Sequence, residues 1–290
     1  MPSRRRHLRE KRKTKTRNFG IFFKILLPVI LILAVLLFFF INTKYWNGKD
    51  KFIYVSKAEG GGVIVTILDP KLNEEVNLTI PGEVEVTVAR NLGTLRLKNV
   101  WQLGTNEKLD GRLVAETVSQ NFLFPVFLWK DDSGKKSNIP VGDSLLVRIF
   151  LLGIKPINKT DVDLAKSQFL MKVRLNDGTP GYRQNGPVSA ALIAYFSDND
   201  LSARNLRIGI VDATGEAGVA QKVGEIIEVV GGKIVSIDKK VISSDSDCLV
   251  SGSETKVIRK IANLLTCKEK NQKTDFDIEI NLGKKFADRF

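Results

Sequence analysis

The side chains available for chemistry in this chain are mainly carboxylates, lysines, arginines and hydroxyls, because it has one histidine, His7, and two cysteines. His7 lies in a basic N-terminal tail, so the rest of the chain cannot hold a Ser-His-Asp or Cys-His arrangement or bind a metal through imidazole. The patterns HExxH, CxxC and GxxxxGK[ST] do not occur, and "DSGKKSN" (132–138) lacks the upstream glycine of a phosphate-binding loop. The residues therefore assign no catalytic residue, no cofactor-binding residue, no metal ligand and no cofactor.

One turn near the C-terminus has the residue types of a ligand site. Gly215 and Gly218 follow an expected strand over 206–213 and open an expected helix, an arrangement that suits anion binding. The three-glycine pattern of a dinucleotide site is incomplete, and glycines at this place also serve simply to turn the chain. Asp212, Thr214, Gly215 and Gly218 form the candidate ligand turn.

The two cysteines, Cys248 and Cys267, lie within the last 45 residues. A disulfide between them closes a loop of about 20 residues, which the chain-entropy model values at about 3 kcal/mol. The alternative is two buried free thiols that pack as small apolar side chains. We favour the disulfide.

An apolar segment follows the N-terminal tail. Positions 21–41 hold 21 consecutive residues whose only charge is Lys24, and a helix of that length is about 30 Å long, the thickness of the hydrocarbon core. Tyr45 and Trp46 come next and suit the opposite interface. The run ends without the small residues of a cleavage site. It therefore predicts an uncleaved, single membrane-spanning helix over 21–43.

The basic tail predicts the orientation of this anchor. Residues 1–20 carry nine of the Lys and Arg residues against one Glu, and so hold most of the net charge of +13. Positive charge beside a spanning helix stays in the cytoplasm, which places residues 44–290 outside the cell membrane. Basic tails also bind nucleic acid or anionic headgroups. No aromatic residue interrupts these charges and no binding fold accompanies them, so we expect a membrane partner and no nucleic acid.

Short β-branched runs bounded by turn residues predict strands in the first exported part. They are "FIYVSK", "GGVIVTILDP", "EEVNLTIPGE" and "VEVTVARN". We expect a helix over 111–122 with Asp110 as its N-cap, and Asp143 as the N-cap of a short apolar helix over 144–152. The segment "LNDGTPGYRQNGP" (175–187) is rich in Gly, Asn and Pro, which indicates a connection between domains.

The last part of the chain alternates strands and helices. Strands are expected at 206–213, "KIVSID", "DCLVSG" and 275–283, and helices over 216–230 and 254–265, each helix with an apolar stripe. Such alternation predicts a compact α/β sandwich. The expected fold class is α/β, with a single N-terminal transmembrane helix followed by two exported α/β domains. Their expected bounds are 52–175 and 205–290, with a linker and connecting helix over 176–204.

Ordered motifs over 205–290 resemble the C-terminal domain found in LytR–CpsA–Psr family proteins and in stand-alone envelope proteins. The motifs are "NLRIGIVDATGEAGVAQKVGEIIEVVGG", "DCLVSG", a helix ending in "LLTC", and "DFDIEINLG". Asp212 stands where Asn is usual in that domain. The resemblance implies a small α/β domain of the cell envelope.

A fainter resemblance links residues 52–130 to the catalytic domain of the same family. "VIVTILDPKLNEEVNLTIPGEVEV" is similar to its strand ending in Asp-Pro, followed by a turn and "SIPRD". Those enzymes transfer a glycopolymer from a polyprenyl pyrophosphate carrier to the cell wall, using Arg and Asp to hold the pyrophosphate and a metal. Here Gly82 and Glu83 replace the Arg-Asp pair, and "SKAEGGG" (56–62) replaces an earlier Asp/Arg cluster.

Three hypotheses follow. The first is a non-catalytic, membrane-anchored envelope protein that binds a cell-wall polymer or an envelope protein. The alternative is a divergent phosphotransferase that attaches polyprenyl-pyrophosphate-linked glycopolymers, in which Lys57, Glu59, Arg90 and Arg96 replace the missing groups. The third is an assembly factor with the same anchor-plus-domain plan. Because the pyrophosphate-binding positions are not kept, the first is preferred.

Overall fold

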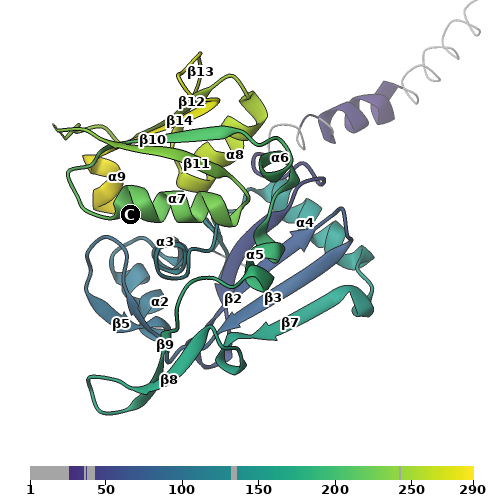
Figure 1. Ribbon diagram of the computed structural model, residues 1–290. Coiled ribbons are helices and arrows are strands. Elements are labelled where there is room, and N and C mark those ends of the chain that lie inside the picture. Colours follow the sequence, from purple (N-terminus) through teal and green to yellow (C-terminus); the bar gives the residue numbers. More distant parts are fainter. Residues whose placement is uncertain (1–25, 36, 38–42, 132–135, 242) are drawn as a thin grey trace, which may run out of the picture.

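The computed structural model of the 290-residue chain describes residues 26–35, 37, 43–131, 136–241 and 243–290. Two five-stranded sheets dominate these residues, one in each half of residues 43–290 (Figure 1). Helices pack against both sheets, so the expected mixed α/β class is confirmed.

The first sheet has the strand order β6-β1-β2-β3-β7. Its strands are β1 (Phe52–Lys57), β2 (Val63–Asp69), β3 (Glu74–Ile80), β6 (Leu128–Trp129) and β7 (Lys159–Asp163). β1, β2 and β3 form an antiparallel meander, and β6 and β7 join its edges in parallel. The first three β-branched runs seen in the sequence thus form the centre of this sheet, whereas the fourth, "VEVTVARN", contributes a strand to a separate hairpin.

Side chains of the first sheet are buried on both faces. On one face Val55, Val63, Val65 and Ile67 join a large core beneath α3 (Gly111–Phe122) and α2 (Leu97–Asn106). On the other face Phe52, Tyr54, Leu68 and Leu128 pack with Trp46 and with Val147 of α4 (Val141–Gly153). Because side chains alternate along a strand, the apolar run of β2 supplies both cores.

Two hairpins and three short 3-10 helices complete the described residues of the first half, the third of these helices being η3 (Leu164–Lys166). The hairpins are β4 (Glu85–Thr87) with β5 (Thr94–Arg96), and β8 (Leu170–Arg174) with β9 (Pro180–Gln184). The 3-10 helix η1 (Glu59–Gly61) joins β1 to β2, and η2 (Pro156–Asn158) precedes β7. Within the expected linker 176–204, the chain forms β9 and two helices, α5 (Ala190–Phe196) and α6 (Asn199–Ser202).

The second sheet has the order β11-β10-β14-β12-β13. Its strands are β10 (Arg207–Ala213), β11 (Lys233–Lys239), β12 (Cys248–Gly252), β13 (Lys268–Asn271) and β14 (Ile278–Gly283). Helices α7 (Val219–Val229), α8 (Thr255–Leu265) and α9 (Lys284–Arg289) lie on the side of this sheet that faces the first half (Figure 1). The apolar stripes of α7 and α8 are buried there, as their spacing predicts.

The predicted membrane segment is described only in part. Residues 26–35 and 37 are helical with exposed apolar side chains, whereas 21–25, 36 and 38–42 of the predicted span lie outside the described residues. Within the described residues, none of the helices combines the length and the apolar character needed to cross a membrane.

The two predicted N-caps differ in outcome: Asp110 is the N-cap residue of α3, as expected, whereas Asp143 is not that of α4. α3 follows Asp110, but the Asp110 side chain makes no capping hydrogen bond and instead pairs with Lys136 Nζ at 2.9 Å. α4 begins at Val141 rather than at Ser144, with Pro140 as its N-cap residue, so Asp143 lies inside the first turn. Its carboxylate turns away from its own helix, because it accepts hydrogen bonds from a segment about a hundred residues earlier in the chain.

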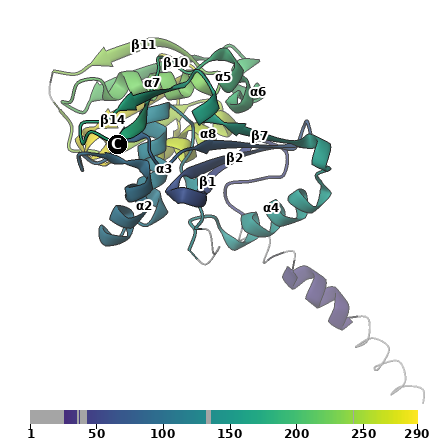
Figure 2. The same ribbon diagram turned by 90° about the horizontal axis from the view of Figure 1, so that it is seen from below.

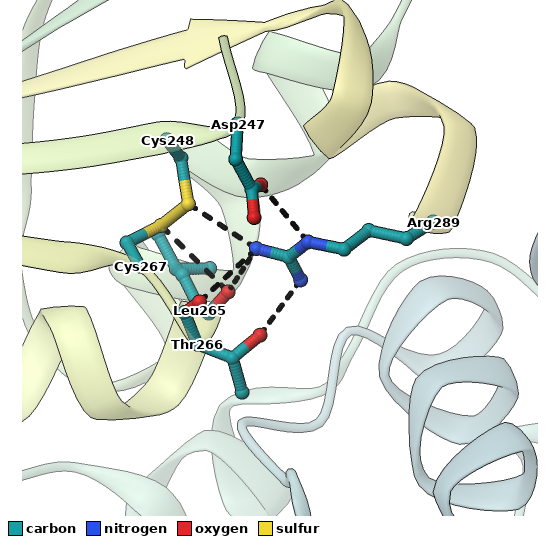
Figure 3. The surroundings of a disulfide bond; sticks show 6 residues. All are labelled: Asp247, Cys248, Leu265, Thr266, Cys267 and Arg289. Atoms are coloured by element: carbon teal, nitrogen blue, oxygen red, sulfur yellow. Dashed lines mark hydrogen bonds and ion pairs between the residues drawn. A yellow bond between two sulfur atoms is a disulfide. The ribbon is translucent and has the colours of Figure 1, made fainter. Parts of the chain in front are cut away.

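Cys248 and Cys267 form a disulfide between β12 and the residue that precedes β13 (Figure 3). Arg289 of α9 extends over this bridge, where its guanidinium donates to Asp247 Oδ1 at 3.0 Å and to the Leu265 carbonyl oxygen at 3.0 Å. Burial lowers the pKa of Arg289, and the carboxylate of Asp247 opposes that effect. The C-terminal helix is thereby held against the disulfide loop.

We expect the double variant Cys248→Ser, Cys267→Ser to lower the free energy of unfolding by about 3 kcal/mol, because the unfolded chain regains the freedom of a loop of about 20 residues. Urea unfolding of the full-length protein, with and without a reducing agent, measures this. The reductant should destabilise the wild type and leave the double variant unchanged. An unfolding midpoint of the wild type that does not move on reduction contradicts the prediction.

Candidate functional site

The candidate ligand turn uses its polar groups within itself. The backbone N–H and hydroxyl of Thr214 donate to Asp212 Oδ1 at 3.0 and 2.6 Å, and the N–H of Glu216 donates to the Thr214 hydroxyl at 3.1 Å. Asp212 and Thr214 are both buried. The carboxylate that the sequence offered as a ligand group therefore stabilises the turn between β10 and α7.

The two glycines of this turn have backbone conformations that favour glycine. Gly215 has φ +80° and Gly218, the N-cap residue of α7, has φ +83°. The backbone N–H groups of Lys240 and Ser244, which follow β11, donate to the carbonyl oxygens of Asp212 and Ala213. The chain after β11 is therefore bonded to the turn. A strand-to-helix turn therefore explains all four residues of the candidate ligand turn: the two polar side chains bond within it, and the two glycines allow its backbone conformation.

Packed backbone fills the place where the family resemblance puts an Arg-Asp pair. Gly82 is buried, and a Cβ there would lie 2.8 Å from the Gly60 carbonyl oxygen and 2.9 Å from the Lys98 Cβ. Gly61 has φ +77°, and a Cβ there would lie 2.7 Å from the Lys98 Cβ. The glycine run 60–62 thus lies directly against Gly82. A larger residue at position 82 would have to displace it.

Glu83 forms an ion-pair cluster beside this glycine contact. Its carboxylate accepts from Lys98 Nζ at 2.7 Å and also pairs with the Arg96 guanidinium. Arg96 in turn pairs with Asp177 Oδ2 at 2.6 Å and hydrogen-bonds to Thr179. The hydrogen bond from Lys98 lowers the pKa of Glu83, and the one from Arg96 lowers it further. The positive charge of Arg96 is compensated by two carboxylates.

The other arginine of the phosphotransferase hypothesis is also paired. Arg90 donates from Nε and from an Nη to the two oxygens of Glu116, at 2.7 and 2.8 Å. This bidentate contact raises the pKa of Arg90. Lys57 ends β1, Glu59 begins η1, and both are exposed. Of the four substitute residues, Lys57 and Glu59 are therefore exposed, and the two arginines are already bound to carboxylates.

A pocket of about 600 Å³ lies at the junction of the two halves. We call it the junction pocket. Four segments form it: 43–53 after the apolar segment, 125–128 before and within β6, 196–201 around α6, and 255–264 of α8. Its apolar wall includes Tyr45, Trp46, Phe127, Leu201, Ile261 and Leu264.

Charged side chains of three segments meet in this pocket. Lys260 of α8 lies 2.8 Å from Asp198, 2.6 Å from Asp200 and 3.3 Å from Asp50. Lys256, one turn earlier, lies 2.7 Å from Asp200 and 3.5 Å from Asp50. Hydrogen bonds from Lys256 and Lys260 hold the pKa of Asp200 well below its usual value of 3.8. This network joins α8 to Asp50, which lies just before β1.

The three carboxylates are close enough together to hold a metal ion. However, both lysine ammonium groups lie within ion-pair distance of them, and the amines already supply the positive charge that a cation would bring. We therefore assign Asp50, Asp198 and Asp200 to the ion-pair network.

Cations remain at the rim of the junction pocket. Arg259 is 60% exposed, and its Nε lies a long 3.4 Å from Glu269 Oε1. The exposed Lys44 lies with its Nζ 4.9 Å from the centre of the Tyr45 ring. Lys256 is half exposed despite its two carboxylate partners. Aromatic and aliphatic walls with a cationic rim suit an anionic ligand that also has an apolar or ring-shaped surface.

Comparisons with known proteins give weak structural likenesses. No protein-family model matches this chain, and neither does any curated protein. The crystal structure of the transcriptional regulator yvhJ from Bacillus subtilis aligns with a TM-score of 0.36 and 10% identity, over 49% of this chain and 92% of that one. The LytR-CPS2A-Psr family protein YwtF (TagT) with bound octaprenyl pyrophosphate lipid aligns with a TM-score of 0.34 and 11% identity, over 49% and 87%.

A third alignment, to TagU of Bacillus subtilis, has a TM-score of 0.24 and 10% identity and covers 75% of this chain and 96% of that one. The neighbours thus include LytR-CPS2A-Psr family proteins, at low identity and, for the higher TM-scores, over about half of this chain. At these values no residue role is transferred to this chain.

Sequence reasoning did not find the junction pocket. Its charged residues come from positions near 50, 198 and 256, and no local spacing connects them. The single available signal was the i, i+4 pair of Lys256 and Lys260 on the polar side of a strongly amphipathic helix. Such a pair is common on exposed helix faces, so it carried no prediction.

We expect Gly82→Arg, which restores the family's residue type, to destabilise the protein by about 2–3 kcal/mol, because the side chain meets the backbone of Gly60 and Gly61. Urea unfolding of the full-length protein measures this. Gly153→Arg is the matched control, since a Cβ at Gly153 meets nothing within 4 Å. Equal stability of the two variants would show that position 82 has room for a ligand-binding side chain.

Proposed function

We propose that this chain is a single-pass, membrane-anchored cell-envelope protein that binds a cell-wall glycopolymer in the junction pocket and does not catalyse its transfer. The N-terminus is cytoplasmic, and the residues from 44 onward face the envelope. Residues 205–290 act as a LytR-type C-terminal domain. The basic tail, the apolar segment and the motifs of the C-terminal part support this proposal.

The observation that carries the proposal is the chemistry of the junction pocket. Phosphate-containing wall polymers combine sugar or polyol units with regularly spaced negative charge. Aromatic side chains such as Tyr45 and Phe127 offer flat surfaces for the neutral units, and Arg259 and Lys44 offer cations for the phosphates. The pocket also begins at residue 43, where the apolar segment ends, so it opens close to the place where the chain leaves the membrane.

The competing proposal is a divergent phosphotransferase. It needs cations free to meet the charge of a pyrophosphate leaving group. Arg90 is bound bidentately by Glu116, and Arg96 is shared between Glu83 and Asp177. Binding a pyrophosphate through either arginine would have to compete with these charge-assisted contacts. Octaprenyl pyrophosphate, the lipid bound to YwtF, is the substrate to offer in a test of this alternative.

We expect Arg259→Glu to weaken polymer binding about tenfold, because one charge-assisted phosphate contact is replaced by repulsion. The measurement is the affinity of the full-length protein in nanodiscs for a poly(glycerol phosphate) wall teichoic acid. Arg207→Glu is the matched control: Arg207 is 59% exposed and lies 3.6 Å from one carboxylate, close to the values for Arg259. It should leave the affinity within about twofold of the wild type.

Equal losses in both variants would indicate non-specific attraction to a basic protein and would contradict the pocket assignment. Retention of an envelope protein but of no polymer would replace the polymer by a protein partner. Magnesium-dependent cleavage of octaprenyl pyrophosphate that is lost in Arg90→Ala would establish the phosphotransferase instead.

A further inference from the structure

The outer face of α4 is apolar and exposed. Val141, Leu145, Ile149 and Leu152 are 65%, 38%, 56% and 88% exposed. Their spacing of four, four and three residues places them on one side of the helix. A helix on a water-covered surface normally turns polar residues outward, so a continuous apolar stripe of this kind marks a contact with another apolar phase.

The inner face of α4 fixes the helix in place. Val147 is buried against the second core of the first sheet, and Leu146, Phe150 and Leu151 pack around it. The ring of Phe150 lies 5.5 Å from that of Trp46 in an edge-to-face arrangement. The exposed stripe is therefore presented by a well-packed helix rather than by a loose segment.

Asp143 connects α4 to the point where the apolar N-terminal segment ends. Its fully buried carboxylate accepts hydrogen bonds from the backbone N–H groups of Lys44, Tyr45 and Trp46, at 3.2, 2.9 and 3.4 Å. The helical residues 26–35 project from the end of the molecule at which α4 lies (Figures 1 and 2). α4 is thus held beside the expected exit from the membrane.

The charges around the stripe fit a lipid surface. Arg148 is exposed next to Ile149, and Lys155 follows the end of the helix. The one acid of α4, Asp143, is buried and engaged. Long basic side chains reach headgroups while their stems cover apolar surface, and cations are favoured near anionic lipids. An apolar stripe flanked by cations is the pattern of a helix lying in the membrane interface.

We propose that α4 lies in the interface of the lipid bilayer, with Val141, Leu145, Ile149 and Leu152 among the upper acyl chains. This inference rests on the membrane anchorage in the proposed function. It gives the exported part a second contact with the bilayer and orients the first sheet relative to it. A second copy of the chain is the competing occupant of the stripe.

The test uses the full-length protein with one added cysteine, since Cys248 and Cys267 are joined to each other. Leu152→Cys carries an environment-sensitive nitrobenzoxadiazole label, in vesicles of phosphatidylglycerol and phosphatidylcholine whose acyl chains carry a doxyl quencher. We expect blue-shifted emission that loses about half its intensity to the quencher. Met171→Cys, an exposed apolar position of β8 at the far end of the molecule in Figure 1, should show neither effect.

A third label separates the two proposals. Leu31→Cys lies in the apolar N-terminal segment and reports anchorage alone. Quenching at position 31 without quenching at 152 overturns the interfacial placement of α4 and leaves the anchorage intact. Absence of quenching at both positions overturns both proposals. A blue shift at 152 that the lipid quencher does not affect shows a protein contact, and a second copy then replaces the bilayer.

Discussion

The carboxylate of Asp143 is the contact on which the arrangement of this molecule depends. It satisfies three consecutive backbone N–H groups of residues 44–46, and one buried carboxylate with several such donors is a strong, directional anchor. From there the Trp46 indole donates to the Asp50 carbonyl oxygen at 2.7 Å. The Asp50 carboxylate then reaches Lys260 of α8. One chain of contacts therefore joins residues 44–50, the first sheet and the C-terminal half.

This chain of contacts also decides where ligand chemistry is available. In the first half, the positions that resemble a pyrophosphate site hold packed glycines and arginines already neutralised by Glu83, Asp177 and Glu116. At the junction, the same segment that Asp143 holds forms one wall of the pocket, and Arg259 remains exposed at its rim. This distribution of charge is the basis of our proposal that the protein binds a polymer without transferring it.

Local patterns in the sequence predicted β1, β2 and β3 of the first sheet, β10, β11, β12 and β14 of the second, and the helices α3, α7 and α8, because each has a regular apolar period or a recognisable end. The short edge strands β6, β7 and β13 were not predicted, because they have two to five residues and no apolar alternation of their own. Asp110 is the N-cap residue of α3 as predicted, although its side chain makes no capping hydrogen bond, and the prediction that Asp143 caps α4 was wrong. An aspartate near a helix start satisfies either its own helix or a distant partner, and for Asp143 that partner lies 97 to 99 residues away. The junction pocket is built from such distant pairs, so no local spacing could reveal it.

Hydrogen exchange at the backbone amides of residues 44–46 tests the central contact most directly. In the full-length wild type, a peptide covering 43–50 should exchange slowly, and Asp143→Ala should remove most of that protection. Asp163→Ala serves as the control, since Asp163 contacts the nearby Ala165 N–H and the Lys166 ammonium, and it should leave the peptide unchanged. If residues 44–46 exchange equally in the wild type and in Asp143→Ala, the buried carboxylate does not hold this segment. The proposed organisation of the junction is then wrong.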